Sequence, residues 1–517
     1  MRRPAVVGLG LGIALLGGLA LWLSEERRPE ELGFHERSCW FPTSEERPAR
    51  CGWMVVPENR SRAESRRIAL PVVIFRAHGE DPPADALLFI NGGPGYRTTI
   101  GNRDEIETWW AWVDAIPKRH EVIVLGLRGT GREAPDFNCP KLIDPRVWSK
   151  ALRRFGSPDP TRTAVTEAAA DCRDRLIAEG VDLTAYNSLE TAADVEDLRL
   201  ALGVKTWSLY GISYGSRIAL TVMRHHPQGL KAVILDSVFP PEAAPTLDYP
   251  RFYKAALNRL FADCRKSTAC RSNFPRLAER FEELRQKLAQ RPRETTLEAI
   301  GFWPKLQLRL DDKALLEIVY NALYWWDLTE RLPFAISSAS TGDFAYLEFL
   351  ATEYYLRDEP SIFSPPVMLS FLCNEEAPFE TAAARAEAIR KGGPFGHMIE
   401  KDWVPLLCPV WPAGVADTLE NTAVESDIPT LLLAGSYDPV TPPELARQAA
   451  AGLTRSHVIL IRNVGHAVFD SHACARTVVS IFLADPTRSP DAACLDEVEA
   501  PDFSGGRAPG RHWFYLR

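Results

Sequence analysis

The stretch Thr206–Pro227 reads TWSLYGISYGSRIALTVMRHHP and places Ser213 between two glycines, each two residues away. Glycine inside a strand or helix costs stability, because it loses more conformational freedom on folding than other residues. A G-x-S-x-G pentapeptide at a sharp strand-to-helix turn accounts for both glycines. It exposes a strained nucleophilic serine, and the glycines leave room for close approach of the chain. The alternative is a chance pentapeptide, since short motifs of common residues recur by accident.

The residues on either side of Ser213 distinguish these two explanations. Residues 207–210 are short, apolar and aromatic, which is typical of a buried strand. Residues 216–224 are rich in apolar side chains and are followed by His-His-Pro, which predicts a helix that ends at a breaker. Strand, serine turn and helix thus occur in the order that a nucleophile elbow requires. We therefore predict that Ser213 is a nucleophile.

The composition is that of a large globular protein. The chain has 517 residues, of which 46% are hydrophobic, so it can bury a large core and form more than one domain. The formal net charge is −8, and no basic block predicts nucleic-acid binding. The cysteines form neither a C-x-x-C pair nor a zinc-like cluster, so no metal or cofactor is expected.

The N-terminus predicts export. A short basic start precedes residues 4–23, which are apolar, uncharged and about as long as the ~20 residues needed to cross a bilayer. Such a segment is either cleaved as a signal peptide or retained as a membrane anchor. Retention is favoured, because the run is long for a signal peptide and Gly18-Leu19-Ala20 is a weak cleavage site. We expect a protein on the periplasmic or extracellular face, with residues 1–33 as anchor and linker. Its oligomeric state is not predicted.

Cysteine usage agrees with export. The chain has 10 cysteines, an even number that can form disulfides in an oxidising compartment. Connectivity cannot be deduced from sequence. The simplest hypothesis joins neighbours in chain order, which gives Cys39–Cys51, Cys139–Cys172, Cys264–Cys270, Cys373–Cys408 and Cys474–Cys494.

Most of the chain alternates strand-like and helix-like segments. Apolar runs between turn residues predict strands within residues 51–59, 68–78, 86–95, 120–131 and 230–238. Residues 188–204 have apolar spacing of three to four and predict a helix, with Ser188 as a possible N-cap. This alternation predicts an α/β sheet that is largely parallel.

The pattern changes after Phe239-Pro240-Pro241. Long aromatic helical segments follow, with no regular strand alternation, until the sheet pattern resumes at Pro429. A helical insertion between two strands of the sheet is the simplest explanation. We expect residues 34–245 to form the first part of the core, residues 246–425 the insertion, and residues 426–517 the second part and a C-terminal tail.

A serine hydroxyl is a weak nucleophile unless a base, oriented by a third group, takes its proton. In sheets of this kind the partners follow in the order Ser, Asp or Glu, His, from loops after successive strands. Asp438 follows the strand-like run 430–437, and His466 follows the run 458–463. Alone, Asp438 would be interpreted as a turn aspartate and His466 as a packed or surface histidine. Their order and loop positions relative to Ser213 predict a catalytic triad.

Other histidines lack that context. His225 and His226 end a helix and are expected to be solvated, whereas His472 is a possible cap of the last helix.

A glycine-rich turn completes the predicted site. Asn91-Gly92-Gly93-Pro94-Gly95 directly follows the strand-like run 86–90. Turns at this place direct backbone N–H groups toward the nucleophile, where they stabilise an oxyanion. We assign the Gly93 and Tyr214 amides as the donors. The alternative is a plain Gly-Pro turn.

The motifs together resemble one enzyme family. G-G-P-G, R-G-T-G (residues 128–131), G-x-S-Y-G, D-P-V-T-P and G-H occur in the order found in the prolyl-aminopeptidase and tripeptidyl-aminopeptidase family of α/β-hydrolases. The match spans about residues 39–494. The resemblance implies an α/β-hydrolase fold, mostly parallel, in which the insertion is a cap over the active site. It also implies that Ser213, Asp438 and His466 are nucleophile, orienter and base. Exported relatives commonly have similar disulfides.

The sequence departs from this family at two loops that border the pocket. Asn91 stands where the family often has histidine, and Gly126 where it often has aspartate. Neither position belongs to the triad, and both bear on the choice of substrate.

The resemblance implies a serine hydrolase that releases N-terminal residues from peptides through an acyl-enzyme. An exopeptidase needs an anion for the substrate ammonium, and Glu375 and Glu376, beside Cys373, are candidates. The alternative, a solvated acidic pair, is favoured by sequence alone. Rival functions are an esterase or amidase on small non-peptide substrates and, less favoured, a non-catalytic binding module. The number of residues removed per cut and the side-chain preference are not predicted.

Overall fold

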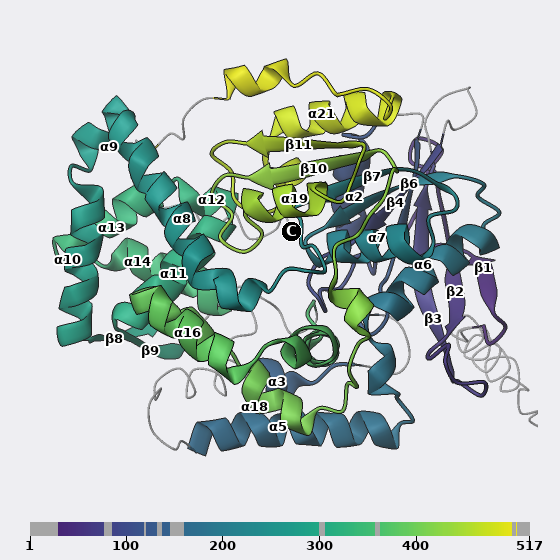
Figure 1. Cartoon of the computed structure of the whole chain (residues 1–517), viewed down its shortest axis with the longest axis horizontal. Helices are drawn as coiled ribbons and strands as arrows, with labels where there is room; N and C mark the ends of the chain where they lie inside the picture. The colour runs from purple at the N-terminus through teal and green to yellow at the C-terminus, as the bar shows by residue number, and fades with distance from the viewer. Residues whose placement is uncertain are drawn as a thin grey trace, which may run out of the picture.

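The computed structural model of the chain describes residues 29–76, 85–117, 120–131, 137–144, 160–298, 305–356, 362–498 and 503 (Figure 1). The predicted export segment, residues 4–23, lies outside these ranges. Among the helices within them, none combines the length and apolar character needed to span a bilayer.

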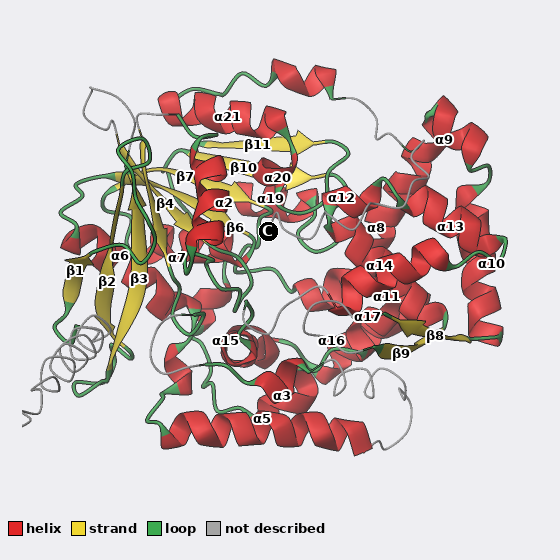
Figure 2. Ribbon diagram, turned by 180° about the vertical axis from the view of Figure 1, so that it is seen from behind, coloured by secondary structure: helices red, strands yellow, loops and turns green. Residues whose placement is uncertain are grey.

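A single twisted sheet organises the core (Figure 2). In the described residues it has nine strands in the order β1-β2-β3-β5-β4-β6-β7-β10-β11. The pairs from β1 to β5 are antiparallel, and those from β5 to β11 are parallel, which confirms the predicted α/β class. The strands are β1 (Gly33–Arg37), β2 (Ala49–Pro57), β3 (Arg67–Phe75), β4 (Asp85–Ile90), β5 (His120–Leu125), β6 (Trp207–Ile212), β7 (Leu230–Asp236), β10 (Thr430–Gly435) and β11 (Ser456–Ile461).

Helices cover both faces of the sheet, which explains why its central strands are continuous apolar runs. Successive side chains of a strand point to opposite faces. In β6, Leu209 packs into the core formed with α6, α7 and α19, whereas Tyr210 packs into the core formed with α2, α20 and α21. The helices outside the insertion are α2 (Arg103–Val113), α3 (Pro140–Ile143), α5 (Pro160–Ala178), η1 (Leu183–Ala185), α6 (Ser188–Ala201), α7 (Tyr214–His225), α19 (Pro443–Ala450), α20 (Val468–Ser471), α21 (Ala473–Ala484) and η7 (Ala493–Glu497).

Two predicted helix caps have different outcomes. His472 caps α21, because its side chain accepts a hydrogen bond from the Cys474 N–H. Ser188 is not the N-cap of α6. Asn187 is, and its side chain accepts from the Glu190 N–H, so the helix begins one residue earlier than the predicted cap implied.

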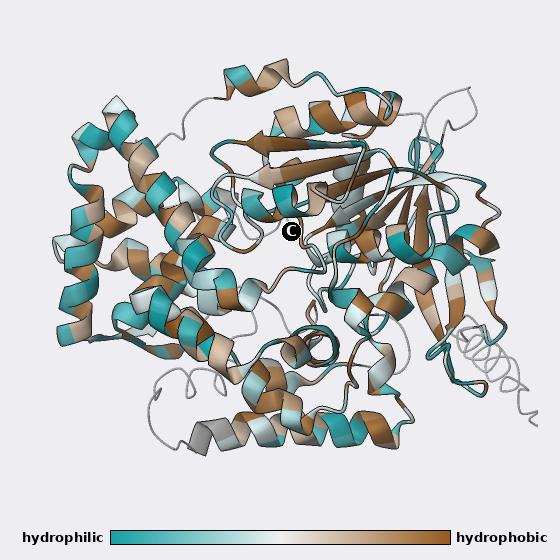
Figure 3. Ribbon diagram, viewed as in Figure 1, coloured by the Kyte–Doolittle hydropathy of each residue, from teal (hydrophilic) through white to brown (hydrophobic). Residues whose placement is uncertain are grey.

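The insertion leaves the sheet after β7 and returns at β10, and these two strands are neighbours that pair Val233 with Thr430. It forms a body of helices beside the sheet with its own apolar core (Figure 1). Polar side chains dominate its outer helix α10, whereas the strands of the central sheet are mostly apolar (Figure 3). The elements are α8 (Pro245–Lys266), α9 (Thr268–Asn273), α10 (Leu277–Gln290), β8 (Arg293–Leu297), β9 (Leu306–Leu310), α11 (Asp312–Tyr324), α12 (Trp326–Thr329), α13 (Leu332–Ser340), α14 (Ala345–Leu356), α15 (Pro365–Phe371), η2 (Leu372–Glu376), η3 (Ala377–Phe379), α16 (Ala382–Gly392), η4 (Gly393–Gly396), α17 (His397–Glu400), α18 (Val404–Leu407), η5 (Cys408–Val410) and η6 (Thr418–Asn421).

The insertion, predicted to be helical and without regular strand alternation, also contains two short strands. β8 and β9 form an antiparallel pair with Arg293 opposite Leu310. Residues 306–310 read LQLRL, and their leucines are buried while the intervening polar residues are exposed. This period of two is the signal of a half-buried strand. It is short enough to be hidden between long helical segments.

All ten cysteines lie in the described residues and form disulfides. The pairs are those of the chain-order hypothesis: Cys39–Cys51, Cys139–Cys172, Cys264–Cys270, Cys373–Cys408 and Cys474–Cys494. Disulfides in this number are typical of proteins that fold in an oxidising compartment, such as the periplasm or the cell exterior.

Candidate active site

Ser213 lies at the junction between β6 and α7, with φ 56° and ψ −123°. A positive φ is a strained conformation for a residue other than glycine. The two flanking glycines are required by close packing. A Cβ on Gly211 would lie 2.3 Å from the Gly215 carbonyl oxygen, and one on Gly215 would lie 2.2 Å from the Ile90 carbonyl oxygen. This geometry is that of a nucleophile elbow.

Asp438 and His466 are in direct contact. The Nδ1 atom of His466 lies 2.7 Å from Oδ2 of Asp438, which accepts the hydrogen bond. The Thr441 hydroxyl donates to the same Oδ2 at 2.6 Å, and the Val440 and Thr441 N–H groups donate to Oδ1 at 2.8 and 2.9 Å. Burial alone would raise the pKa of Asp438, but the charge of His466 and these hydrogen bonds lower it below its ordinary value.

The contact with Asp438 leaves the second nitrogen of His466 available. Its Nε2 atom is buried and has no hydrogen-bond partner among the described residues. Ser213, Asp438 and His466 follow the carboxyl ends of β6, β10 and β11, which are parallel strands of one sheet. The carboxyl ends of parallel strands meet at one edge, where open α/β sheets bind their ligands.

The glycine-rich loop after β4 lies against Ser213. A Cβ on Gly92 would be 3.0 Å from the Ser213 Cβ and 3.6 Å from its Oγ. The Gly92 N–H donates to the Asn91 side chain at 2.8 Å. In the described part of the chain, the N–H groups of Gly93 and Tyr214, the two predicted donors, have no acceptor.

Local packing explains both departures from the family pattern. The Asn91 side chain holds the glycine loop, because its amide also donates to the Tyr96 and Arg97 carbonyls at 3.4 and 3.2 Å. At Gly126, a Cβ would meet the ring of Pro71 at 2.5 Å, so an aspartate would not fit without movement of the neighbouring strand.

Glu375 and Glu376 are both buried, so a solvated acidic pair was the wrong interpretation. They lie in η2, a π-helical turn held by the disulfide of Cys373. Both carboxylates bind the guanidinium of Arg217, at 3.2 Å from its Nε and 2.7 Å from its Nη1. Arg217 comes four residues after Ser213 in α7, about 6 Å along the helix axis. The glutamates therefore bind a side chain of the helix that begins directly after the candidate nucleophile.

The two glutamates differ in how far their hydrogen-bonding capacity is used. Glu375 accepts from the Ser188 N–H at 2.6 Å with one oxygen and binds Arg217 with the other. Glu376 binds Arg217 with Oε1, and its Oε2 has no partner among the described residues. Burial raises the pKa of the Glu376 carboxyl to about 8. The positive charge of Arg217 lowers this pKa and offsets the effect of burial only in part. Glu376 is therefore the carboxylate with capacity for a further cation.

Several residues of this region were not predicted from sequence. Arg217 had a usable signal, because it is a charged residue within an otherwise apolar helix pattern four residues after Ser213. Thr441 also had one, since it stands three residues after Asp438 in a turn, where a hydroxyl commonly bonds the aspartate. Tyr324, which stacks on His466, had none, because the contact joins distant parts of the chain.

Of the other histidines, His225 is not solvated as predicted. It is partly buried, and its Nε2 lies 2.7 Å from the Glu420 carboxylate of the insertion. The end of α7 contacts the returning chain there, which shields the ring from water only in part.

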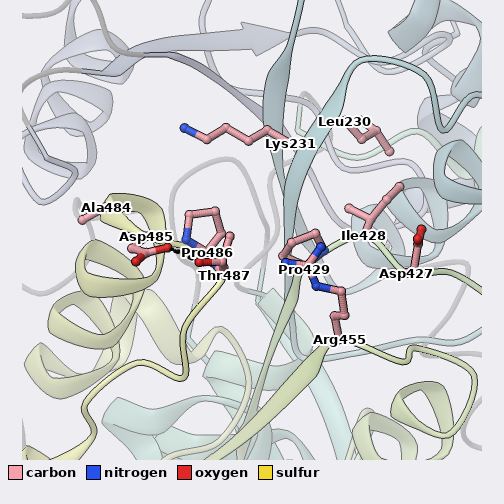
Figure 4. A pocket seen from close by; sticks show the side chains of 10 residues that line it. All are labelled: Leu230, Lys231, Asp427, Ile428, Pro429, Arg455, Ala484, Asp485, Pro486 and Thr487. Carbon is pink, nitrogen blue, oxygen red and sulfur yellow. Dashed lines mark hydrogen bonds between the residues drawn. The ribbon is translucent and has the colours of Figure 1, made fainter.

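A surface pocket of about 500 Å³ lies elsewhere (Figure 4). Leu230 and Lys231 begin β7 in its wall, and Pro429 directly precedes β10. The pocket is thus at the amino ends of the parallel strands, whereas Ser213 follows a carboxyl end. It is distinct from the candidate active site. Within the described ranges, no group of three or more His, Cys, Asp or Glu side chains is arranged to hold a metal.

Comparison with known families agrees with this geometry. The family described as alpha/beta hydrolase fold matches residues 85–473, which is more than half of the 517 residues. The chain therefore belongs to the α/β-hydrolase fold family, and it is a serine hydrolase of that superfamily. The resemblance inferred from the motifs is confirmed, since aminopeptidases of this superfamily are among the similar proteins.

Three similar proteins illustrate the relationship. Serine protease Hip1 of Mycobacterium tuberculosis is 24% identical over 487 residues, which cover 88% of this chain and 90% of Hip1. Tripeptidyl aminopeptidase of Streptomyces lividans is 25% identical over 226 residues, covering 41% of this chain and 40% of that protein. Among solved structures, a thermophilic esterase from Thermogutta terrifontis has a TM-score of 0.34 at 15% identity, covering 84% of this chain and 100% of the esterase chain.

The environment of Asp438 predicts a pH-dependent contribution to stability. Because its pKa is lowered in the folded state, it stabilises the fold above the unfolded value of about 3.9 and ceases to do so as pH falls through the folded value. We expect Asp438→Asn to lower the free energy of unfolding by about 1.5–3 kcal/mol at pH 6, as for a hydrogen bond to a charged group. Urea unfolding at a series of pH values measures this difference, which should shrink toward pH 2. A difference that stays constant would contradict the prediction.

Proposed function

We propose that Ser213, Asp438 and His466 are the catalytic triad of an aminopeptidase. His466 takes the proton of the Ser213 hydroxyl on Nε2 as the oxygen attacks the scissile carbonyl. Asp438, 2.7 Å from Nδ1, fixes the tautomer of His466 and stabilises the imidazolium. The same proton then passes to the leaving amine. Water attacks the acyl-enzyme by the reverse of these steps and releases the N-terminal fragment.

The oxyanion of each tetrahedral intermediate is assigned to the Gly93 and Tyr214 amides. Both N–H groups lack an acceptor in the described part of the chain, and the loop that carries Gly93 lies against Ser213. Fixed donors of this kind stabilise a developing negative charge without reorganisation at the moment of reaction.

The observation that carries the aminopeptidase assignment is the buried carboxylate of Glu376, which binds Arg217 in the helix that begins directly after Ser213. One of its oxygens is uncommitted, and its raised pKa shows that Arg217 compensates its charge incompletely. A substrate ammonium is a cation of suitable size and charge for that oxygen. Glu375 has a supporting role, because its oxygens already hold the start of α6 and Arg217. We propose that residues 246–425 form the cap that encloses this anchor.

The similar proteins support a peptide substrate. Hip1 is named a serine protease, and the Streptomyces protein a tripeptidyl aminopeptidase. An esterase or amidase with the same triad remains the alternative function. It would not depend on a free amino group, so the experiments below distinguish the two.

Export through residues 4–23 stays part of the proposal. The disulfides support a protein that folds in the periplasm or outside the cell. The N-terminal sequence of the mature protein distinguishes a cleaved segment from one that is retained as a membrane anchor.

Replacement of the nucleophile tests the triad. Ser213→Ala should retain the fold and lose nearly all turnover of peptides and esters, because loss of a triad member leaves only about 10³–10⁴-fold catalysis over water. Steady-state kinetics and labelling by a fluorophosphonate probe measure the loss. Ser213→Ala with turnover within about tenfold of the wild type would refute the assignment.

Blocking the amino group tests the anchor. Breaking a buried charge pair costs about 2–5 kcal/mol, so N-acetylation of a peptide substrate should lower kcat/KM by about 30- to 5,000-fold. Glu376→Gln should cause a similar loss on free peptides and little change on acetylated ones, because both changes break one contact.

Glu387→Gln is the matched control for this isosteric change. Glu387 lies in α16 of the proposed cap, with its side chain 44% exposed and paired with Arg390, and should show no effect. Equal cleavage of free and acetylated peptides would favour the esterase or amidase function. A loss on acetylation with no loss in Glu376→Gln would keep the aminopeptidase and reject this anchor.

The ratio of kcat/KM for free over acetylated peptides should depend on pH. The Glu376 carboxyl, with a pKa of about 8, becomes protonated and neutral as pH falls below that value. A peptide amino group loses its proton above a pKa of about 7.7–8.0. The preference for free peptides should therefore be greatest near pH 8 and fall on both sides. Effects of His466 cancel in the ratio, because they act on both substrates. Glu376→Gln should remove the pH dependence of the ratio on the acid side. A wild-type ratio that does not change between pH 6 and 9 would argue against a titrating carboxylate at the anchor.

A further inference from the structure

The C-terminal end of helix α11, inside the proposed cap, contacts the loop that carries His466. The His466 N–H donates to the carbonyl oxygen of Tyr324 at 2.9 Å. The Tyr324 ring stacks on the imidazole, with ring centroids 4.3 Å apart and planes inclined by 21°. The rings of Trp325 and Tyr324 pack edge to face, with centroids 4.7 Å apart. The insertion therefore touches both the backbone and the side chain of the candidate base.

Gly465 shows how tightly the two segments fit. A Cβ at this position would lie 2.4 Å from the Leu323 carbonyl oxygen and 2.6 Å from that of Tyr324. No side chain larger than hydrogen fits there unless α11 moves. The glycine of the G-H motif thus makes room for the end of a helix that comes from the insertion.

Two features of this contact favour positive charge on His466. The last carbonyls of a helix carry partial negative charge, and cations near them are stabilised. The face of an aromatic ring attracts a cation lying over it. At the edge of the imidazole, its Nδ1 atom faces Asp438 and Thr441, from the loop after β10. The ring and the helix end add to the stabilisation that Asp438 gives the imidazolium while His466 holds the proton of Ser213.

We propose that the cap completes the catalytic base, with Tyr324 as a positioning residue that holds the His466 ring and stabilises its protonated form. The proposal rests on the assigned triad and not on the choice of substrate. It gives the insertion a role in the chemical step, in addition to any role in enclosing the substrate. Displacement of α11 from the His466 loop would leave Ser213 without a fully oriented base.

The test uses a small ester, 4-nitrophenyl acetate, which reports on the triad without the amine anchor. Loss of a cation–π contact of about 0.5–2 kcal/mol corresponds to about a 2- to 30-fold fall in rate. Tyr324→Leu should lower kcat by that factor for both the ester and a free peptide, with little change in KM. It should also slow fluorophosphonate labelling of Ser213. Tyr324→Phe keeps the ring and should restore all three readouts.

Phe334→Leu is the control for packing within the insertion. Phe334 lies in α13, where its ring contacts Tyr346 at 5.1 Å, and its replacement should leave ester turnover unchanged. Gly465→Ala tests the same contact from the other side and should also lower kcat for the ester. It provides the test if Tyr324→Leu does not fold.

Three outcomes would overturn the proposal. They are full ester turnover in Tyr324→Leu, full ester turnover in Gly465→Ala, and a loss in Tyr324→Phe equal to that in Tyr324→Leu. A loss confined to KM for the peptide would show that Tyr324 only lines the substrate pocket. Failure of the triad itself is recognised separately, because the wild type would then hydrolyse the ester no faster than Ser213→Ala.

Discussion

The buried guanidinium of Arg217 is the interaction on which the arrangement of the site depends. It is 1% exposed and lies 5.1 Å from the centroids of both Phe239 and Phe371, two aromatic rings that also contact each other edge to face. A buried charge of this kind is costly unless it is paired and hydrogen-bonded. Its partners are the π-helical carboxylates, and α7 therefore fixes the insertion relative to the serine. Removing either carboxylate would leave the guanidinium poorly compensated.

Hydrogen bonds around Ser213 hold its backbone in the strained conformation. A positive φ at a serine persists only where the surrounding structure enforces it. Here the Ser213 N–H donates to the Asp236 carbonyl at 2.8 Å, which extends the pairing of β6 with β7 into the turn. The Asp236 carboxylate in turn accepts the N–H groups of Val468 and Phe469 at 3.0 and 2.9 Å, just after His466. One residue at the end of β7 thus links the serine turn to the histidine loop.

The parts of the site that sequence predicts are those encoded locally. Ser213, Asp438 and His466 each stand in a short motif soon after a strand, and strand order places those ends together. The pairing of Arg217 with Glu376 could not be predicted, because the two residues are 159 positions apart and no local pattern relates them. Strand β1 was missed for a different reason. Its residues GFHER are half-exposed at the sheet edge and lack the apolar run that marked the other strands.

The disulfides have a consequence for how the chain acquires its structure. Each cysteine is bonded to the next one along the chain, at separations of 6 to 35 residues. A chain that enters an oxidising compartment from its N-terminus exposes its cysteines in that same order. Each native partner is then the next thiol to emerge, and the competing thiols are still on the other side of the membrane. Under the export proposed above, the order of translocation by itself favours the native pairs, and little rearrangement by thiol exchange is needed. No bridge joins the insertion to the sheet, so the two parts can be oxidised before they pack together.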